Sequence, residues 1–184
     1  MILFDVGGMY MYRDKEYTIS FKLNNLNETQ LKKINTYLGS CRFVYNTILA
    51  AYMETNKLYD NISDYFTKLD SLIEEHDWLK EIDKNVLKTY LISAMKTVYA
   101  YNRSKKKFTL KFKSKKKPQT LLIKTINKNI LNELNAMGID TSKFTDKIKY
   151  ISIQKLNKTD IFVHVTVERK VYGYRSKEQE TSKK

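Results

Sequence analysis

One apolar stripe in the first third of the chain constrains its fold most strongly. Behind Asn27-Glu28-Thr29-Gln30, apolar residues recur at alternating spacings of three and four, the period of one face of an α-helix. These residues are Leu31, Ile34, Leu38, Cys41, Tyr45, Ile48 and Tyr52. Asn27 and Gln30 match the N-cap and N3 positions of a capping box. The pattern predicts a helix of about six turns that ends near Lys57 and buries one face against other elements.

Two further helices are predicted after this one. The first spans about 63–76 and carries Phe66, Leu69, Leu72 and Ile73 on its inward face. The second begins behind Asp83, a good N-cap residue, and ends around Arg103. Its buried face is expected to consist of Val86, Leu87, Tyr90, Leu91, Ala94, Val98 and Tyr101. The middle of the chain is therefore predicted to be helical.

Apolar and polar residues alternate on both sides of the helical region, as they do in half-buried strands. This alternation covers Lys15 to Leu23, and later Lys149 to Leu156 and Ile161 to Val171. We expect the last two segments to form a hairpin around residues 157–160. A strand from Leu121 and a helix over 130–137, ended by Gly138, are expected between the helical region and this hairpin.

The order of these elements predicts an α+β fold, in which a small β-barrel or sheet is interrupted by a helical insertion. Residues 1–26 and 104–173 would form the β region and residues 27–103 the helical lobe. Residues 174–184 are polar and charged, and we expect them to be a disordered tail.

Charge is concentrated in one segment. The chain has 34 Lys and Arg residues against 20 Asp and Glu residues, a net charge of +14. Nine of the basic residues, and no acidic residue, lie between Arg103 and Lys117. A polyanion, above all a nucleic acid, is the usual partner of such a segment. Part of the lysine excess also fits the composition bias of an AT-rich genome.

Within this segment Phe108, Leu110 and Phe112 alternate with polar residues, which predicts a strand with one basic edge that ends at Pro118. The candidate nucleic-acid contacts are Arg103, Lys105, Lys106, Lys107, Lys111, Phe112, Lys113, Lys115, Lys116 and Lys117. Two interpretations remain open for Phe108 and Phe112, which either stack on unpaired bases or belong to the core.

Arg42 and Asn46 are two further candidate contacts. They lie four residues apart on the polar side of the first predicted helix. They either contact phosphate groups or fill a packing gap, and the sequence does not decide between these roles.

Several function classes are disfavoured. Cys41, His76 and His164 lie far apart and have no second ligand at metal-binding spacing, so no metal or other cofactor is expected. We find neither a glycine-rich phosphate loop nor a nucleophile with a recognisable base, and we expect no enzyme activity. The chain also lacks a stretch of about 18 apolar residues, so no membrane partner is expected. A single cysteine suits the reducing cytoplasm.

Several segments of the chain are similar to those of a known family, and the most specific of them is Cys41-Arg42-Phe43-Val44-Tyr45-Asn46. With this segment the chain resembles the N-terminal half of the TnpB (OrfB) proteins of bacterial insertion sequences, which are related to type V CRISPR effectors. The other similar segments are Ser20–Leu23, Asn27–Gln30, Leu79–Ile82, Val86-Leu87, Lys107–Lys117, Ile151–Ile153 and Ile161–Glu168. The resemblance implies a wedge-type β-barrel with a helical recognition lobe, the half that grips guide RNA.

In that family a RuvC-like nuclease domain and a zinc-binding region follow, whereas this sequence ends at Lys184. We therefore expect a non-catalytic protein that binds structured, guide-like RNA and acts as a regulator or inhibitor of an RNA-guided system. A phage anti-CRISPR protein that targets an RNA-guided effector is one form of this hypothesis. The alternatives are a subunit of a split nuclease, whose catalytic partner is encoded separately, and a helix-turn-helix regulator that binds DNA.

Overall fold

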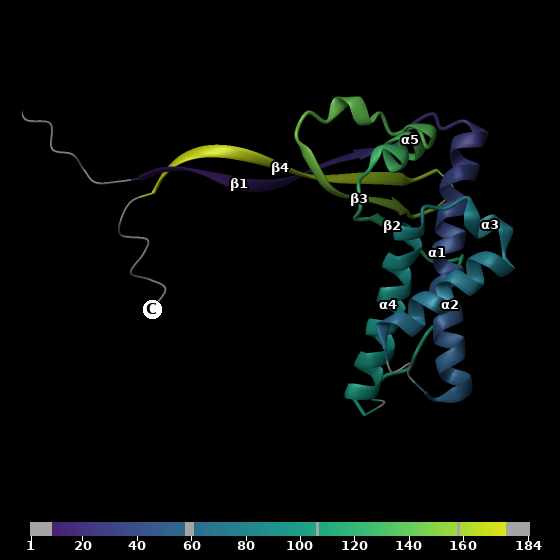
Figure 1. The fold of residues 1–184 in the computed structure, drawn as a ribbon. Helices are drawn as coiled ribbons and strands as arrows, with labels where there is room; N and C mark the ends of the chain where they lie inside the picture. The colour runs from purple at the N-terminus through teal and green to yellow at the C-terminus, as the bar shows by residue number, and fades with distance from the viewer. Residues whose placement is uncertain (1–8, 58–60, 106, 158, 176–184) are drawn as a thin grey trace, which may run out of the picture.

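The computed structural model describes residues 9–57, 61–105, 107–157 and 159–175, and it has an α+β fold (Figure 1). Its elements are, in chain order, β1 (Met9–Lys22), α1 (Glu28–Thr55), α2 (Ile62–Glu75), α3 (Asp77–Lys80), α4 (Lys84–Arg103), β2 (Gln119–Ile123), α5 (Lys128–Ala136), the 3-10 helix η1 (Thr141–Lys143), β3 (Lys147–Lys155) and β4 (Ile161–Arg175). The predicted fold class is confirmed. The short helix α3 was not predicted.

The described strands form one antiparallel sheet in the order β1-β4-β3-β2. The sheet is open, with β1 and β2 at its edges, so these strands do not close the barrel that the sequence suggested. Figure 1 shows the long β1–β4 ribbon extending away from the helices. Tyr174 and Arg175 still belong to β4, although the sequence analysis placed them in the tail. Residues 1–8 and 176–184, which include the rest of that tail, lie outside the described residues.

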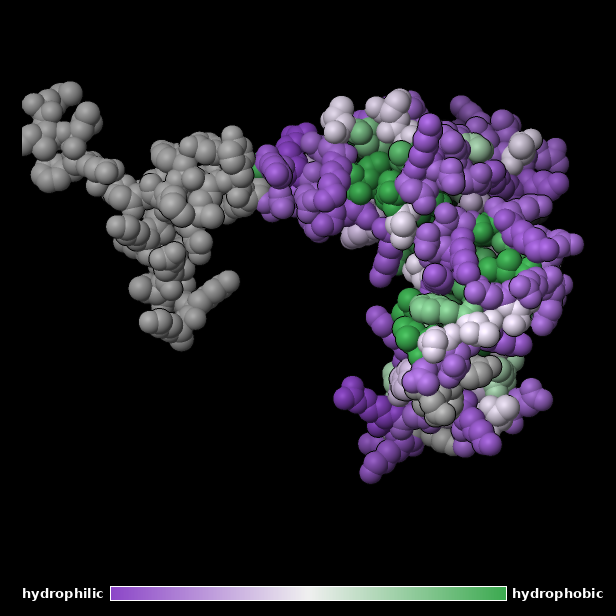
Figure 2. Space-filling model, in the orientation of Figure 1, coloured by the Kyte–Doolittle hydropathy of each residue, from purple (hydrophilic) through white to green (hydrophobic). Residues whose placement is uncertain are grey.

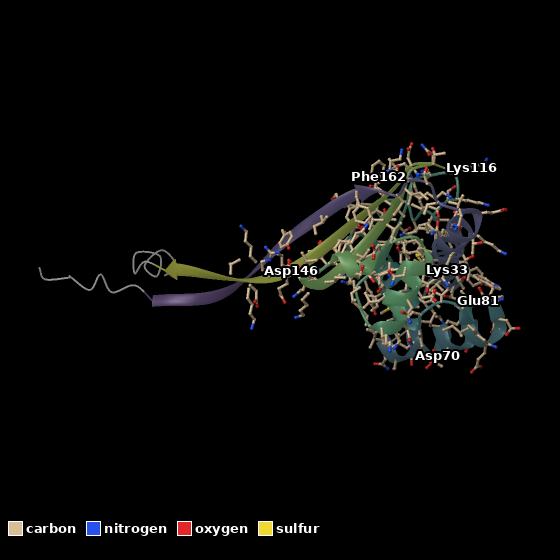
Figure 3. The ribbon with its side chains drawn as sticks, turned by 90° about the horizontal axis from the view of Figure 1, so that it is seen from above. Lys33, Asp70, Glu81, Lys116, Asp146 and Phe162 are labelled. Carbon is tan, nitrogen blue, oxygen red and sulfur yellow. The ribbon has the colours of Figure 1, made fainter. Side chains whose placement is uncertain are left out.

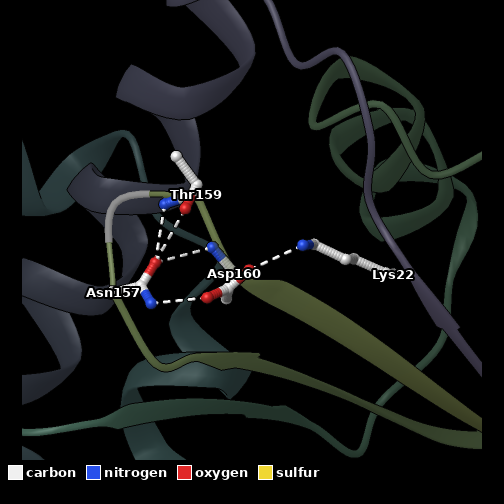
Figure 4. Close-up of polar contacts among 4 residues, drawn as sticks. All are labelled: Lys22, Asn157, Thr159 and Asp160. Atoms are coloured by element: carbon white, nitrogen blue, oxygen red, sulfur yellow. Dashed lines mark hydrogen bonds and ion pairs between the residues drawn. The ribbon is translucent and has the colours of Figure 1, made fainter.

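The β3–β4 turn is held by one asparagine side chain (Figure 4). Asn157 Oδ1 accepts hydrogen bonds from the backbone N–H groups of Thr159 and Asp160, at 2.9 and 2.8 Å. Asp160 in turn pairs with Lys22 of β1, with 2.6 Å between Oδ1 and Nζ. These contacts fix the turn where the sequence predicted it, because asparagine side chains readily bond to backbone groups a few residues further on.

One face of the sheet belongs to the core. The alternating residues of β2, β3 and β4 on this face are fully buried, as the period of two requires. They are Leu121, Ile123, Ile151, Ile153, Ile161, Val163, Val165 and Val167. The other face carries polar cross-strand pairs, among them Thr18 with Thr166 at 2.9 Å between hydroxyl oxygens.

The apolar stripe of α1 is buried except for Leu31, which is partly buried, and α1 packs against α4. Asn27 and Gln30 form the predicted capping box, in which each side chain bonds to the other residue's backbone N–H at 2.9 Å. Asp83 caps α4 by accepting from the N–H of Asn85 at 2.8 Å. These two long helices position the candidate site, because α1 contains Arg42 and Asn46 and α4 leads into the basic segment.

Gly138 ends α5 with a φ of +86°, in the left-handed region that favours glycine. A Cβ atom at this position would lie 2.9 Å from Leu26 Cδ2. The predicted role of Gly138 at the end of the helix is therefore confirmed. No helix of the described residues is long and apolar enough to cross a membrane.

Candidate nucleic-acid interface

The basic segment is a loop, and the predicted strand over it is wrong. Residues 104–118, here called the basic loop, connect α4 to β2 and have no place in the sheet as far as they are described. Leu110 is 8% exposed and anchors the loop in the core, while Phe108 and Phe112 are 43% and 52% exposed. Only one of the three alternating apolar residues is therefore buried, so the alternation does not mark the buried face of a strand. Of the two interpretations of these phenylalanines, the structure favours exposure over burial.

Asn46 of α1 holds the middle of the basic loop. Its Nδ2 donates to the backbone carbonyl of Lys113 at 3.0 Å, and its Oδ1 accepts from the backbone N–H of Lys113 at 2.8 Å. The Asn46 side chain thereby satisfies both the N–H and the C=O of Lys113, which has no neighbouring strand. The backbone of Lys113 therefore needs no neighbouring strand to satisfy its hydrogen-bonding groups.

Arg42, one turn before Asn46, holds the end of the loop. Its Nη1 donates to Gln119 Oε1 at 2.8 Å, and Gln119 Nε2 donates to the backbone carbonyl of Lys115 at 3.0 Å. Of the two roles considered for Arg42 and Asn46, the geometry supports a structural one for Asn46. Arg42 is only partly used in this way, because a guanidinium has five N–H donors and Gln119 Oε1 accepts from one of its nitrogens, Nη1.

Lys113 differs from the other lysines of the loop. Its Nζ lies 4.5 Å from the ring centre of Tyr45 and 5.0 Å from that of Tyr90, within the range of cation–π attraction. Desolvation of the ammonium group by these surroundings lowers the pKa of Lys113, even though much of the residue remains exposed. Lys113 therefore binds the loop to α1 and α4 rather than offering a freely solvated charge.

The remaining lysines of the loop that the structure describes are exposed or nearly so, and they make no ion pair. They are Lys105, Lys107, Lys111, Lys115, Lys116 and Lys117. Lys106 lies outside the described residues. Two lysines of the sheet differ, since Lys147 and Lys149 pair with Glu168 at 3.0 and 2.8 Å. The basic loop thus carries a dense group of lysines that have no carboxylate partner within the described part of the chain.

Figures 2 and 3 show where hydrophilic side chains and some of the charged ones lie. In Figure 3, Lys116 and Phe162 lie toward one edge of the molecule, and the acidic Asp70 and Glu81 lie toward the opposite edge. Figure 2 shows hydrophilic side chains over both the sheet and the helices, with smaller hydrophobic areas between them.

A pocket of about 340 Å³, here called the loop pocket, opens between the basic loop and α1. Cationic and aromatic side chains line it together with the start of β2. The lining residues are Leu38, Arg42, Tyr90, Phe112, Lys113, Ser114, Lys117, Pro118, Gln119 and Thr120. Four of them, Arg42, Phe112, Lys113 and Lys117, were predicted from the sequence as nucleic-acid contacts.

The other lining residues were missed for two reasons. Tyr90 was assigned to the buried face of α4, and it is buried, but its hydroxyl reaches β2, where it donates to the carbonyl of Thr120 and accepts from the N–H of Leu122. Gln119 carries no sequence signal of its own, because its role depends on where Arg42 lies. The candidate Arg103 lies elsewhere, in a shallow groove on α4 beside Lys96 and Tyr99.

A metal ion is usually held by three or more His, Cys, Asp or Glu side chains. Within the described residues no three of these side chains lie close enough together to bind one. Cys41 is buried in the α1 stripe, and desolvation raises the pKa of its thiol. A buried thiol of this kind is a poor nucleophile, since the thiolate is the reactive form.

Residues 11–58 match a family model that is described as a helix-turn-helix domain and named for OrfB_IS605. The match supports an N-terminal domain of the TnpB/OrfB type and a role in nucleic-acid binding. It includes Arg42 and Asn46 but ends before the basic loop. In the described part of this range the structure has a strand and one long helix, β1 and α1. No curated protein matches the chain.

Proposed function

We propose that this chain binds structured RNA through the basic loop, without cleaving it, and that it regulates or inhibits an RNA-guided system. The observation that carries the proposal is the set of unpaired lysines on a loop whose backbone is fixed by Arg42 and Asn46. Lysines that lack carboxylate partners can neutralise phosphates and release counterions at no cost in broken ion pairs.

The fixed backbone matters for the kind of nucleic acid. A disordered basic tail adapts to any polyanion, whereas a loop held at Lys113 and Lys115 presents its charges in one arrangement. Exposed Phe112 adds a ring on which an unpaired base can stack. Folded RNA offers both closely spaced phosphates and unpaired bases, so it suits this surface better than regular duplex DNA.

A helix-turn-helix regulator of DNA is the second candidate, because the description of the matching family model favours it. Such a regulator places a recognition helix in the major groove after a short turn. The described part of the matched range contains the single helix α1, whose 28 residues include the buried stripe. This favours RNA over DNA as the ligand.

A titration at one near-physiological salt concentration tests the proposal. A guide-like RNA with helical and unpaired parts, the same sequence as DNA, and random duplex DNA would be compared, with magnesium present. We expect the RNA to bind most tightly and all three nucleic acids to stay intact. Equal affinity for the three would reject RNA recognition, and a margin of about 10³ or more for one DNA duplex would assign the chain to the DNA regulators.

Cleavage of a nucleic acid in this titration would have one of two meanings, depending on whether the chain acts alone. Metal-dependent cleavage by the purified chain would overturn the proposal that the chain is not an enzyme. Cleavage that appears only after a second protein is added would instead favour the split-nuclease alternative.

A further inference from the structure

We propose that the loop pocket binds a single unpaired nucleotide of the RNA, with the base against Phe112 and the phosphate near Arg42 and Lys117. The inference rests on the proposed RNA binding and assigns one part of the RNA to one place on the protein. The loop pocket combines three cationic side chains with the exposed ring of Phe112, and it lies on the loop that carries the unpaired lysines.

The charges of the pocket select an anion. Arg42, Lys113 and Lys117 all line it, and no acidic residue does so in the described part of the chain. Gln119 orients the guanidinium of Arg42 through the 2.8 Å hydrogen bond to Nη1, which leaves its other donors for a ligand. A planar guanidinium held in this way suits phosphate oxygens, which it can bind through two N–H groups.

The aromatic ring and the size of the pocket indicate that the anion is the phosphate of a nucleotide. Phe112 lines the pocket and is 52% exposed, so a large apolar surface is available for stacking. At about 340 Å³ the pocket lies at the lower end of the range of small-ligand sites, which suits one nucleotide rather than a helix. A free inorganic anion would leave the ring unused.

The polar groups of the pocket predict how selective it is. Gln119 uses its oxygen for Arg42 and its nitrogen for the carbonyl of Lys115. The hydroxyl of Tyr90 is engaged by the backbone of β2. Both side chains are already oriented by the protein, which leaves them few donors and acceptors for the edge of a base, and we expect stacking that tolerates all four bases.

Three RNA hairpins with stems of equal length test the inference by fluorescence anisotropy. One is fully paired, one carries a single-nucleotide bulge, and one carries an abasic residue at the bulge. The intact chain should prefer the bulged hairpin over the other two by about fivefold to 100-fold, the range that stacking of one base provides. The base at the bulge should make little difference.

Two variants of Phe112 and one control variant locate the effect. Phe112→Ala and Phe112→Leu should both remove the preference for the bulge, and Phe112→Leu keeps an apolar side chain, which guards against a general loss of structure. Phe108→Ala is the matched control, because Phe108 is a second exposed phenylalanine of the same loop that does not line the pocket and packs against Tyr101 at 5.4 Å between ring centres. It should keep the preference.

The outcomes separate this inference from the proposed function. Equal binding of all three hairpins by the intact chain would overturn the nucleotide site and leave RNA binding in place. A preference that survives in both Phe112 variants would overturn it as well. If the intact chain binds none of the hairpins, the proposed function itself fails.

Discussion

The side chain of Asn46 takes the place that a neighbouring strand would have beside Lys113. A carboxamide carries one acceptor and one donor group in a geometry similar to that of a peptide unit, so it can pair with the N–H and the C=O of the same residue. Both bonds are present, at 2.8 and 3.0 Å. The position of the basic loop relative to α1 therefore depends strongly on one residue.

We predict that Asn46→Ala loosens the basic loop without unfolding the helices. Removing the carboxamide removes two hydrogen bonds of about 0.5–1.5 kcal/mol each, so the free energy of unfolding should fall by about 1–3 kcal/mol. The amide proton of Lys113 should also exchange with solvent faster, because Asn46 Oδ1 is its acceptor. Urea unfolding and hydrogen exchange measure the two effects. Unchanged exchange at Lys113 would contradict the assigned role.

At the scale of elements, the start of β3 and the residue before it are joined to the middle parts of β1 and β4 by ion pairs and hydrogen bonds. Arg169 of β4 donates from Nε to both oxygens of Asp146 at 3.0 Å. This hydrogen bonding by Arg169 is the main reason why the pKa of Asp146 lies below its usual value, and the hydrogen bond from Tyr17 contributes next. The pKa of Glu168 is lowered in the same way, first by Lys149.

These lowered pKa values predict how stability depends on pH. A carboxyl group whose pKa is lower in the folded chain stabilises the fold above its unfolded pKa, near 4, and loses this effect as the pH falls through the folded pKa. The free energy of unfolding should therefore drop between about pH 5 and pH 2. Arg169→Met should make this drop smaller. Lys170→Met, at the neighbouring exposed residue of β4 that makes no ion pair within the described part of the chain, serves as the control and should leave the drop unchanged.

The sequence predicted the periodic elements well because their own residues determine them. Ile161, Val163, Val165 and Val167 alternate in sequence and are all buried on one face of β4. The same reasoning failed for Phe108 to Lys113, because alternation shows that a chain is extended and does not show which element it pairs with. The partner here is the side chain of Asn46, 67 residues earlier in the sequence.

The candidate site was predicted in part for the same reason. Lys111, Lys115 and Lys116 were found from composition, which does not depend on the fold. That Lys113 packs against Tyr45 and Tyr90, and is thus the least solvated charge of the loop, follows from tertiary contacts that no local pattern encodes. The tertiary packing of α1 likewise places Arg42 in the lining of a pocket, whereas the sequence indicated only that it lies on the polar side of a helix.

For the molecule as a whole, the arrangement of charge should matter more than its amount. The chain carries +14, but many lysines outside the basic loop are already paired with carboxylates. Phosphate binding by a paired lysine must first compete with its own carboxylate partner. Unpaired lysines have no such competitor, so they should account for most of the counterion release on binding.

We therefore predict different effects from two triple variants that each remove three positive charges. Lys111→Ala, Lys115→Ala and Lys116→Ala together should weaken RNA binding and reduce the log–log salt slope by about 0.7–0.9 for each phosphate that is no longer neutralised. Lys22→Ala, Lys80→Ala and Lys147→Ala together remove lysines that pair with Asp160, Asp77 and Glu168. Since exposed ion pairs contribute only about 0–1 kcal/mol each, this second set should fold and should keep nearly the full slope. If both sets lower the slope equally, net charge alone governs binding and the basic loop is not the interface.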